Sequence, residues 1–297
     1  MHRFTMFILI LLMPIAASAL EVFVCEPEWG SLLEELAGDN AEITVATTAF
    51  QDPHRLQARP SLIAAVRRAD LVVCTGADLE IGWLPLLLRR SGNAKIQTGN
   101  PGYFLAANFV RRLEIPKSID RAQGDVHPQG NPHIHLNPGN IRRVADALAE
   151  RLTVLDAGNS NEYQARLEDF QARWQDATER WEDRALQLEG MRLASHHRSF
   201  SYLADWLDLD IVATLESKPG VPPSGAQLAA LLEQLTPNPP LGVIRTPYEN
   251  EKPSQWLAER LELPEIKLPY TIGGTDNSVD LFSLYDETIR MLEEHNR

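Results

Sequence analysis

Residues 161–187 read NEYQARLEDFQARWQDATERWEDRALQ and carry the longest helical pattern of the chain. Their apolar side chains recur at spacings of three and four residues, which places them on one face of a helix. At a rise of about 1.5 Å per residue, about 27 residues span roughly 40 Å, the width of a domain. The pattern predicts a rigid helix that lies along two halves of the chain and ends before Gly190. The apolar positions are Tyr163, Leu167, Phe170, Trp174, Ala177, Trp181 and Leu188.

The sequence on both sides of this helix alternates between strand and helix patterns. Such alternation is typical of parallel sheets covered by helices, so we predict an α/β fold. We expect two α/β lobes, each with a parallel sheet flanked by helices, joined by the one long rigid helix. The expected boundaries are 20–160 for the N-terminal lobe, 161–189 for the linking helix and 190–297 for the C-terminal lobe.

The individual elements follow from alternating or continuous apolar runs bounded by Gly, Pro and polar residues. Strands are expected at 21–25, 42–47, 70–75, 94–97, 191–195, 210–215, 241–246 and 264–268. Helices are expected at 31–36, 60–69, 79–91, 141–152, 198–207, 224–235, 254–262 and 278–294. Residues 116–130 are polar and rich in Pro and Gly, and they are expected to form a loop.

The first residues have the features of a secretory signal peptide. A weakly basic start precedes a short apolar run at 7–15, and Ala17-Ser-Ala19 fits a cleavage site. The apolar run is too short for a stable membrane span. Val24 stands before Cys25, where a lipoprotein cleavage site needs a small residue. We therefore expect residues 1–19 to be removed from an exported, periplasmic protein without a lipid anchor.

Charge and cysteine content narrow the class of protein further. The formal net charge of −13 argues against nucleic acid and anionic lipid as partners. Cys25 and Cys74 are the two cysteines, and each lies at the end of a predicted strand. They are either buried free thiols or a disulfide, if the two strands are neighbours in the sheet.

The stretch 131–138, Asn-Pro-His-Ile-His-Leu-Asn-Pro, places two imidazoles between two prolines. His133 and His135 are two residues apart, so in an extended segment both rings point to the same side. Each proline fixes its own φ and restricts the residue before it, which holds the backbone before any ligand binds. Neutral nitrogen donors on a stiff segment suit a borderline-soft divalent metal. The alternative is a surface turn with incidental histidines.

Three more polar stretches lie at loops where α/β folds place their ligands. His54 is the last residue of the stretch Asp52-Pro-His54, which lies in the loop before a predicted helix. Ser195-His-His197 directly follows the predicted strand 191–195, and Gly273-Gly-Thr-Asp276 follows the strand 264–268. Together with the stretch 131–138, they form a candidate site that draws on both lobes.

In this order, the stretches resemble the ligand segments of the cluster A-I, ZnuA-like (ZnuA/TroA-like) metal-binding proteins of zinc and manganese ABC importers. Asp52-Pro-His54, followed by Arg59-Pro-Ser61, is similar to the first ligand loop of that family. Residues 131–138 resemble its Asp-Pro-His-x-Trp-Leu-Asp-Pro signature. The third and last ligand segments resemble residues 195–202 and 273–276, and the loop 219–224 is also family-like. The resemblance covers almost the whole chain after residue 19.

Position by position, the resemblance implies four metal ligands, namely His54, His133, His197 and Asp276. Three neutral imidazoles and one carboxylate favour Zn²⁺ in a four-coordinate site. Manganese-binding relatives carry Glu at the third ligand position, so His197 favours zinc. The chain departs from the signature at a few positions, and Asp280 is an alternative to Asp276. The departures are His135 for the usual Trp, and Asn131 and Asn137 for the usual Asp residues.

The other histidines near these stretches have less specific roles. We assign His127, in the loop 116–130, at most a transient part in metal capture. His135 is expected to pack behind the site, and His196 to face away from the metal. Asp52 is expected either to orient its neighbour His54 by a hydrogen bond or to cap a helix.

The resemblance implies a periplasmic zinc-binding protein, not an enzyme, that delivers Zn²⁺ to the permease of an ABC importer. We expect a monomer, with a periplasmic metallochaperone as a further partner. The alternatives are a manganese or other divalent-metal protein of the same family, and a zinc metallohydrolase. The hydrolase is disfavoured because all four ligand positions are expected to be filled by protein, whereas catalytic zinc keeps an open position.

Overall fold

A computed structural model of the chain describes residues 19–117, 124 and 127–296. The predicted signal peptide, residues 1–19, lies outside the described residues except for Ala19. Within the described part of the chain, none of the helices combines the length and the apolar character that a membrane crossing requires.

The N-terminal lobe contains a four-stranded parallel sheet in the order β2-β1-β3-β4. Its strands are β1 (Leu20–Val24), β2 (Ala41–Val45), β3 (Leu71–Cys74) and β4 (Tyr103–Leu105). The helices of this lobe are α1 (Pro27–Ala37), α2 (Pro60–Arg68), α3 (Leu84–Ser91) and α4 (Pro138–Leu155). Every residue of β3 is buried, as expected for a parallel strand covered on both faces.

The C-terminal lobe repeats this plan with a second parallel sheet, in the order β6-β5-β7-β8. Its strands are β5 (Arg192–Ser195), β6 (Asp210–Thr214), β7 (Gly242–Arg245) and β8 (Glu265–Lys267). The helices are α6 (Ser201–Leu207), α7 (Gly225–Leu235), α8 (Glu251–Leu261) and α9 (Leu281–His295). The predicted α/β fold with two parallel sheets is confirmed.

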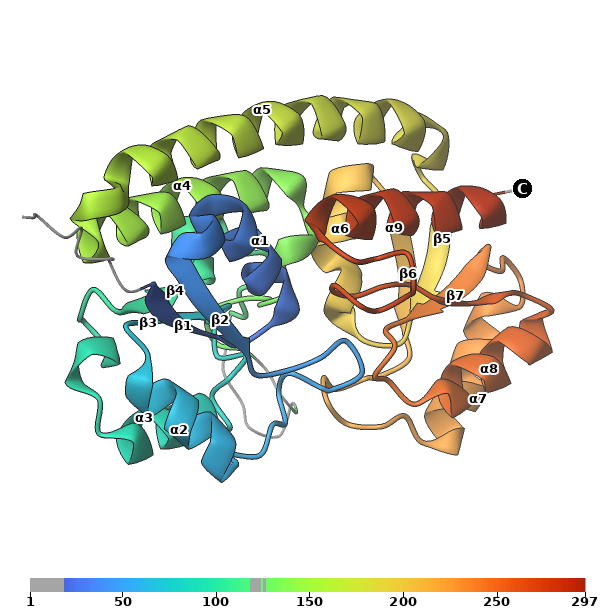
Figure 1. Ribbon diagram of the computed structural model, residues 1–297. Helices are drawn as coiled ribbons and strands as arrows, with labels where there is room; N and C mark the ends of the chain where they lie inside the picture. The colour runs from blue at the N-terminus through green and yellow to red at the C-terminus, as the bar shows by residue number, and fades with distance from the viewer. Residues whose placement is uncertain (1–18, 118–123, 125–126, 297) are drawn as a thin grey trace, which may run out of the picture.

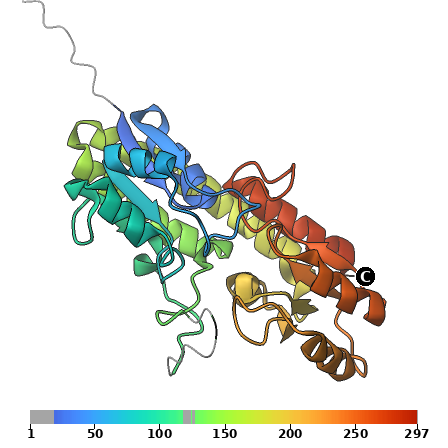
Figure 2. The same cartoon turned by 90° about the horizontal axis from the view of Figure 1, so that it is seen from below.

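The long helix α5 (Ser160–Ala185) lies across both lobes, above α4 on one side and α9 on the other (Figure 1). Its buried face has the predicted spacing of three and four residues. Figure 2 shows the two lobes side by side along its length. The boundaries 20–160, 161–189 and 190–297 stay a prediction. The buried residues of α5 are Tyr163, Leu167, Phe170, Trp174, Ala177, Trp181 and Ala185.

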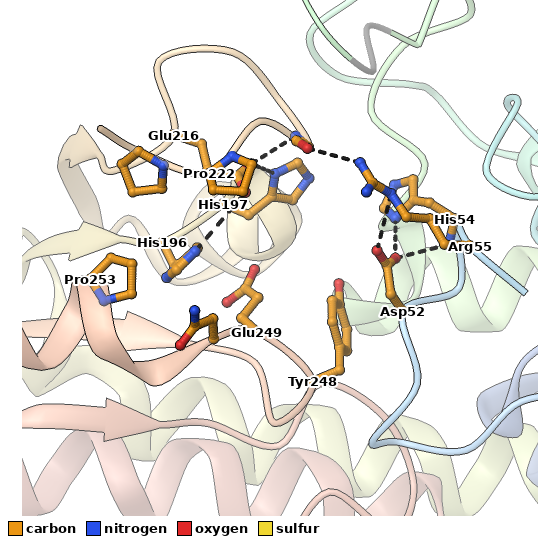
Figure 3. Close-up of a pocket in the computed structure, with 13 residues that line it drawn as sticks. Asp52, His54, Arg55, His196, His197, Glu216, Pro222, Tyr248, Glu249 and Pro253 are labelled. Atoms are coloured by element: carbon orange, nitrogen blue, oxygen red, sulfur yellow. Dashed lines mark hydrogen bonds and ion pairs between the residues drawn. The ribbon is translucent and has the colours of Figure 1, made fainter. Parts of the chain in front are cut away.

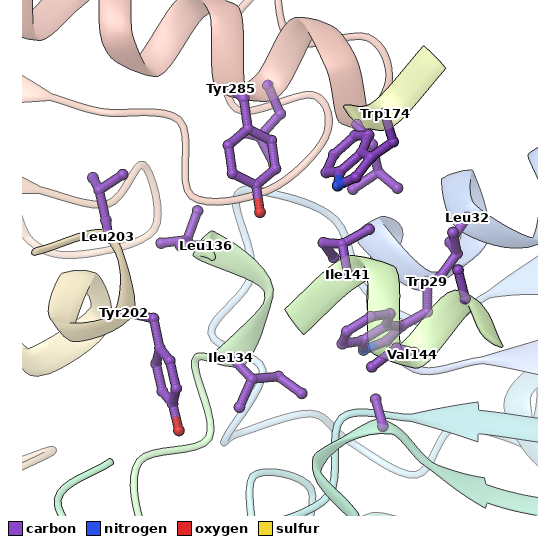
Figure 4. Close-up of a cluster of buried hydrophobic side chains, with 14 of the residues drawn as sticks. Trp29, Leu32, Ile134, Leu136, Ile141, Val144, Trp174, Tyr202, Leu203 and Tyr285 are labelled. Carbon is purple, nitrogen blue, oxygen red and sulfur yellow. The ribbon is translucent and has the colours of Figure 1, made fainter. Parts of the chain in front are cut away.

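One apolar core runs beneath α5 and through both lobes. It extends from Leu20 in β1 to Leu292 in α9. Figure 4 shows members from each side of the molecule, among them Trp29 from α1, Trp174 from α5 and Tyr285 from α9. Because α9 packs against both α5 and α1, the C-terminal helix joins the two lobes. A shared core of this kind resists independent movement of the lobes, since interiors are close-packed.

Two local predictions in the N-terminal lobe are wrong. Residues 94–97 do not form a strand: η2 (Ala94–Ile96) is a 3-10 turn, whose cap Asn93 accepts a hydrogen bond from the Lys95 N–H. The fourth strand is β4, which pairs with β3 although it has three residues. The helix expected over 79–91 begins only at Leu84.

Short 3-10 turns complete the described elements. They are η1 (Gly38–Asn40), η3 (Ala106–Phe109), η5 (Ile134–Leu136), η6 (Ala157–Asn159), η7 (Leu186–Leu188) and η8 (Arg198–Phe200).

Cys25 and Cys74 form a disulfide, with their Cα atoms 4.8 Å apart. Cys25 directly follows β1, and Cys74 is the last residue of β3. These two strands are neighbours in the sheet and pair Val24 with Val73. The alternative that the sequence left open is thus resolved by the strand order. The disulfide joins the carboxyl ends of the two central strands of this sheet.

Candidate metal centre

Three imidazoles from two lobes meet between the carboxyl ends of the two sheets. His54 lies in the loop between β2 and α2, and His133 directly precedes η5. His197 follows β5 in the other lobe. One ring nitrogen of each lies within 4.8 Å of the other two, a spacing that could hold a metal ion. The structure therefore brings together three of the four residues that the sequence singled out.

A hydrogen-bond partner holds the Nδ1 side of each of these imidazoles. A carboxylate or hydroxyl in that position orients the ring and leaves Nε2 as the remaining ligand atom. The Nε2 atom of His133 is buried and has no hydrogen-bond partner among the described residues, which a bound metal would explain. The pairs are His54 with Asp52 Oδ1 at 2.8 Å, His133 with Tyr270 Oη at 2.7 Å and His197 with Glu216 Oε2 at 2.8 Å.

Burial keeps the central imidazole neutral. Loss of solvent around His133 lowers its pKa well below the ordinary value, and the neighbouring His197 and His54 rings lower it further. A neutral imidazole keeps its lone pair for a metal, whereas a protonated ring cannot bind one. For Asp52, burial acts to raise the pKa, but hydrogen bonds from His54 bring it below the ordinary value. Asp52 is thus a charged acceptor that holds the His54 ring.

Asp276, the expected fourth ligand, is not part of this group among the described residues. The side chain of Asp276 is exposed. The loop around it is held by hydrogen bonds between other residues of the same loop. Gly273 N–H donates to the Ser278 carbonyl at 2.6 Å, and Thr275 N–H to the Ser278 hydroxyl at 2.9 Å. The alternative, Asp280, caps α9 by accepting a hydrogen bond from Ser283 N–H at 2.7 Å. A ligand role for Asp276 rests on the sequence resemblance alone.

His127 lies closer to the cluster than the sequence indicated. Its Nε2 atom is 3.2 Å from the Nε2 atom of His54, and the ring centroids are 5.2 Å apart. Two ligand nitrogens of a tetrahedral zinc ion, each about 2.0 Å from the metal, are separated by about 3.3 Å. A lone histidine in a polar loop gives no sequence signal for this position.

His135 and His196 are buried behind the cluster and face other partners. His135 Nε2 lies 2.8 Å from the Tyr270 carbonyl oxygen, and its Nδ1 atom is 3.2 Å from a Glu28 carboxylate oxygen. His196 Nδ1 lies 2.9 Å from the Ser254 hydroxyl, and burial lowers the pKa of His196 to about 4. Both rings thus support the walls of the site.

Two cavities lie on either side of the cluster. One of about 190 Å³ is lined by His54, His197, Glu216 and Glu249, all drawn in Figure 3. Burial raises the pKa of Glu249 to about 8, so this carboxyl group is largely protonated at neutral pH. A second cavity of about 610 Å³ is lined by His127, His133 and His197. The histidine cluster is therefore reached from solvent between the lobes.

The sequence reasoning missed Glu216 and Tyr270 as partners of the imidazoles. Tyr270 is 137 residues away from His133 in the chain, and Glu216 follows a strand that neighbours β5. Only the order of strands in the folded sheet brings Glu216 beside His197. No spacing in the sequence carries that information.

Two lipoproteins are among the curated proteins that are similar to this chain. The manganese ABC transporter substrate-binding lipoprotein PsaA of Streptococcus anginosus is 27% identical over 138 residues, which cover 46% of this chain and 42% of PsaA. The zinc-binding lipoprotein AdcA of Streptococcus pneumoniae is 24% identical over 232 residues, which cover 77% of this chain and 44% of AdcA. The chain spans less than half the length of the curated relatives it matches.

Solved structures have the same fold. A crystal structure of ZnuA superposes with a TM-score of 0.76 at 23% identity, covering 93% of this chain and 99% of that one. A periplasmic metal binding protein from candidatus liberibacter asiaticus gives a TM-score of 0.74 at 13% identity, with 93% and 99% covered. A family model described as "ZnuA: Zinc-uptake complex component A periplasmic" matches residues 22–295. The chain therefore belongs to the ZnuA family.

Proposed function

We propose that this protein binds Zn²⁺ in the periplasm and, as a monomer, delivers it to the permease of an ABC importer. The observation that carries the proposal is the convergence of three imidazole nitrogens whose opposite ring atoms are already hydrogen-bonded. Imidazole suits zinc, whereas manganese prefers oxygen ligands. Membership of the ZnuA family and the zinc-binding relative AdcA support the same choice.

The manganese relative PsaA makes selectivity the first point to test. We expect the purified, metal-stripped protein to bind one Zn²⁺ with an affinity at least about 100-fold above that for Mn²⁺, because three nitrogen ligands favour zinc. Elemental analysis and a zinc titration in a competing chelator, repeated with excess Mn²⁺, measure this ratio. Manganese affinity equal to or above that for zinc would show a manganese protein instead.

The fourth ligand is a separate question, and we propose His127 for it. His127 lies against His54, whereas Asp276 is exposed and held in its own turn. We expect His127→Ala to weaken zinc binding at least about 10-fold, because a metal ligand is lost, and Asp276→Ala to leave it unchanged. Calorimetric zinc titrations of both variants distinguish the two residues. The reverse pattern would favour Asp276.

The case against a metallohydrolase now depends on the family and not on a filled coordination shell. Within the described residues, three of the four ligands expected from the sequence come together, so that expected set does not carry the exclusion. The family model describes a component of a zinc-uptake complex, which is a binding role.

A further inference from the structure

A short loop of the C-terminal lobe, residues 216–223, is attached to the metal-site imidazole of the same lobe. We call this loop, between β6 and α7, the strap. Glu216 Oε2 lies 2.8 Å from His197 Nδ1 and accepts a hydrogen bond from Gly220 N–H at 2.8 Å. Gly220 has a φ of 72°, a left-handed conformation in which a side chain would be strained. One carboxylate oxygen therefore fixes both the imidazole and the turn of the strap.

The other lobe holds the same strap through an arginine. Arg55 Nη2 donates a hydrogen bond to the Gly220 carbonyl oxygen at 2.9 Å, across 165 residues of sequence. Arg55 Nε also lies 3.9 Å from Asp52 Oδ2, and the other oxygen of Asp52 holds His54. Figure 3 shows this line of contacts from His54 through Asp52 and Arg55 toward Glu216 and His197. The contacts thus connect two imidazoles of different lobes without passing through the metal position.

The strap also forms a wall of the site. Pro222 and Pro223 line the cavity of about 190 Å³ that is also lined by His54 and His197. On the opposite side, Gly124 of the N-terminal lobe lies so close that an added Cβ would be 2.4 Å from the Pro219 carbonyl oxygen. The strap is therefore contacted from the N-terminal lobe at two points, and it forms one wall of this cavity.

We propose that Arg55 is a positioning residue that keeps the strap closed over the bound cation and so slows its release. The proposal rests on the zinc-binding function proposed above. Arg55 places a positive charge near a site for a divalent cation, so its direct electrostatic effect opposes binding. A contribution of Arg55 to cation retention then comes from its contacts, which are the hydrogen bond to the strap and the ion pair with Asp52. The two effects predict opposite changes when Arg55 is removed.

The test is the rate of zinc release from Arg55→Ala, measured by stopped flow against an excess of a chromophoric chelator. We expect release about 10-fold faster than in the parent protein, because a hydrogen bond from a charged donor is lost. Arg55→Lys keeps the charge without the planar guanidinium and should release zinc at an intermediate rate. Equal thermal unfolding of the metal-free variants shows that the fold is intact.

Arg67→Ala is the matched control. Arg67 is also exposed and also donates to a backbone carbonyl, that of Ser91 at 3.3 Å, but within one lobe. Its zinc release should equal that of the parent. If Arg55→Ala released zinc at the parent rate, or more slowly as electrostatics alone predicts, the proposed role of Arg55 would be overturned. The proposed zinc binding would be unaffected by that result. A parent protein that binds no zinc would overturn both proposals.

Discussion

Replacing His133 with alanine should weaken zinc binding by about two to three orders of magnitude, since a structural zinc site of four ligands is worth about 10–16 kcal/mol, or about 2.5–4 kcal/mol per ligand. His133 has the largest expected effect of the three imidazoles because its ring is the most buried of them. Its Nε2 atom has no hydrogen-bond partner among the described residues, and a bound metal would give this atom one. A chelator-competition titration measures the change in affinity.

His196→Ala is the control for the loss of a buried ring at this site. His196 is also buried, but it is not one of the three clustered imidazoles: its Nδ1 atom lies 2.9 Å from the Ser254 hydroxyl, and its Nε2 atom lies 4.0 Å from Glu216 Oε1. We expect its zinc affinity to stay within a few-fold of the parent value, and circular dichroism to show both variants folded. Unchanged zinc affinity in His133→Ala, or an equal loss in the two variants, would contradict the ligand assignment.

Replacing Trp174 with alanine should lower the free energy of unfolding by about 3–5 kcal/mol, the usual cost of removing a large buried aromatic side chain. Trp174 lies at the centre of α5, within 5.3 Å of the Tyr285 ring centroid of α9. Its Nε1 atom donates to the Pro138 carbonyl at 3.0 Å, so the substitution also leaves a buried acceptor without its donor. Because the core is shared, we expect the two lobes to unfold in a single transition that moves to lower urea concentration.

Coincident urea transitions by far-ultraviolet circular dichroism and tryptophan fluorescence test this cooperativity. Trp256→Ala is the control, since Trp256 is half-buried on α8 and packs beneath the Arg260 guanidinium at 3.9 Å. Its expected cost is about 1 kcal/mol, in the range of one exposed cation–π contact and partial burial. Two separate transitions in the parent protein would show that the lobes do not share one stabilising core.

Short-range patterns in the sequence predicted the scaffold well. The spacing from Tyr163 to Trp181 predicted the buried face of α5, because helical periodicity is a property of neighbouring turns. Buried strands such as Leu71–Cys74 were readable for the same reason. The strand β4, of three residues, was missed because its place depends on pairing with β3, which the local sequence does not specify.

The site was predictable only in part. His54, His133 and His197 follow strands or open helices, where α/β folds gather ligands, and they matched family segments in order. Glu216 and Tyr270 became visible only once the strand order and the lobe packing were known. The exposed position of Asp276 depends on hydrogen bonds within its own loop, which a motif does not specify. The contact between Arg55 and Gly220 joins two lobes and leaves no trace in either local sequence.

A crystal structure of the zinc-loaded protein, with anomalous difference maps at the zinc edge, tests most directly whether both lobes bind one cation. We predict a single zinc peak about 2.0–2.1 Å from the Nε2 atoms of His54, His133 and His197. A zinc ion bound by the residues of one lobe only, or at any position away from these three nitrogens, would contradict the proposed metal centre.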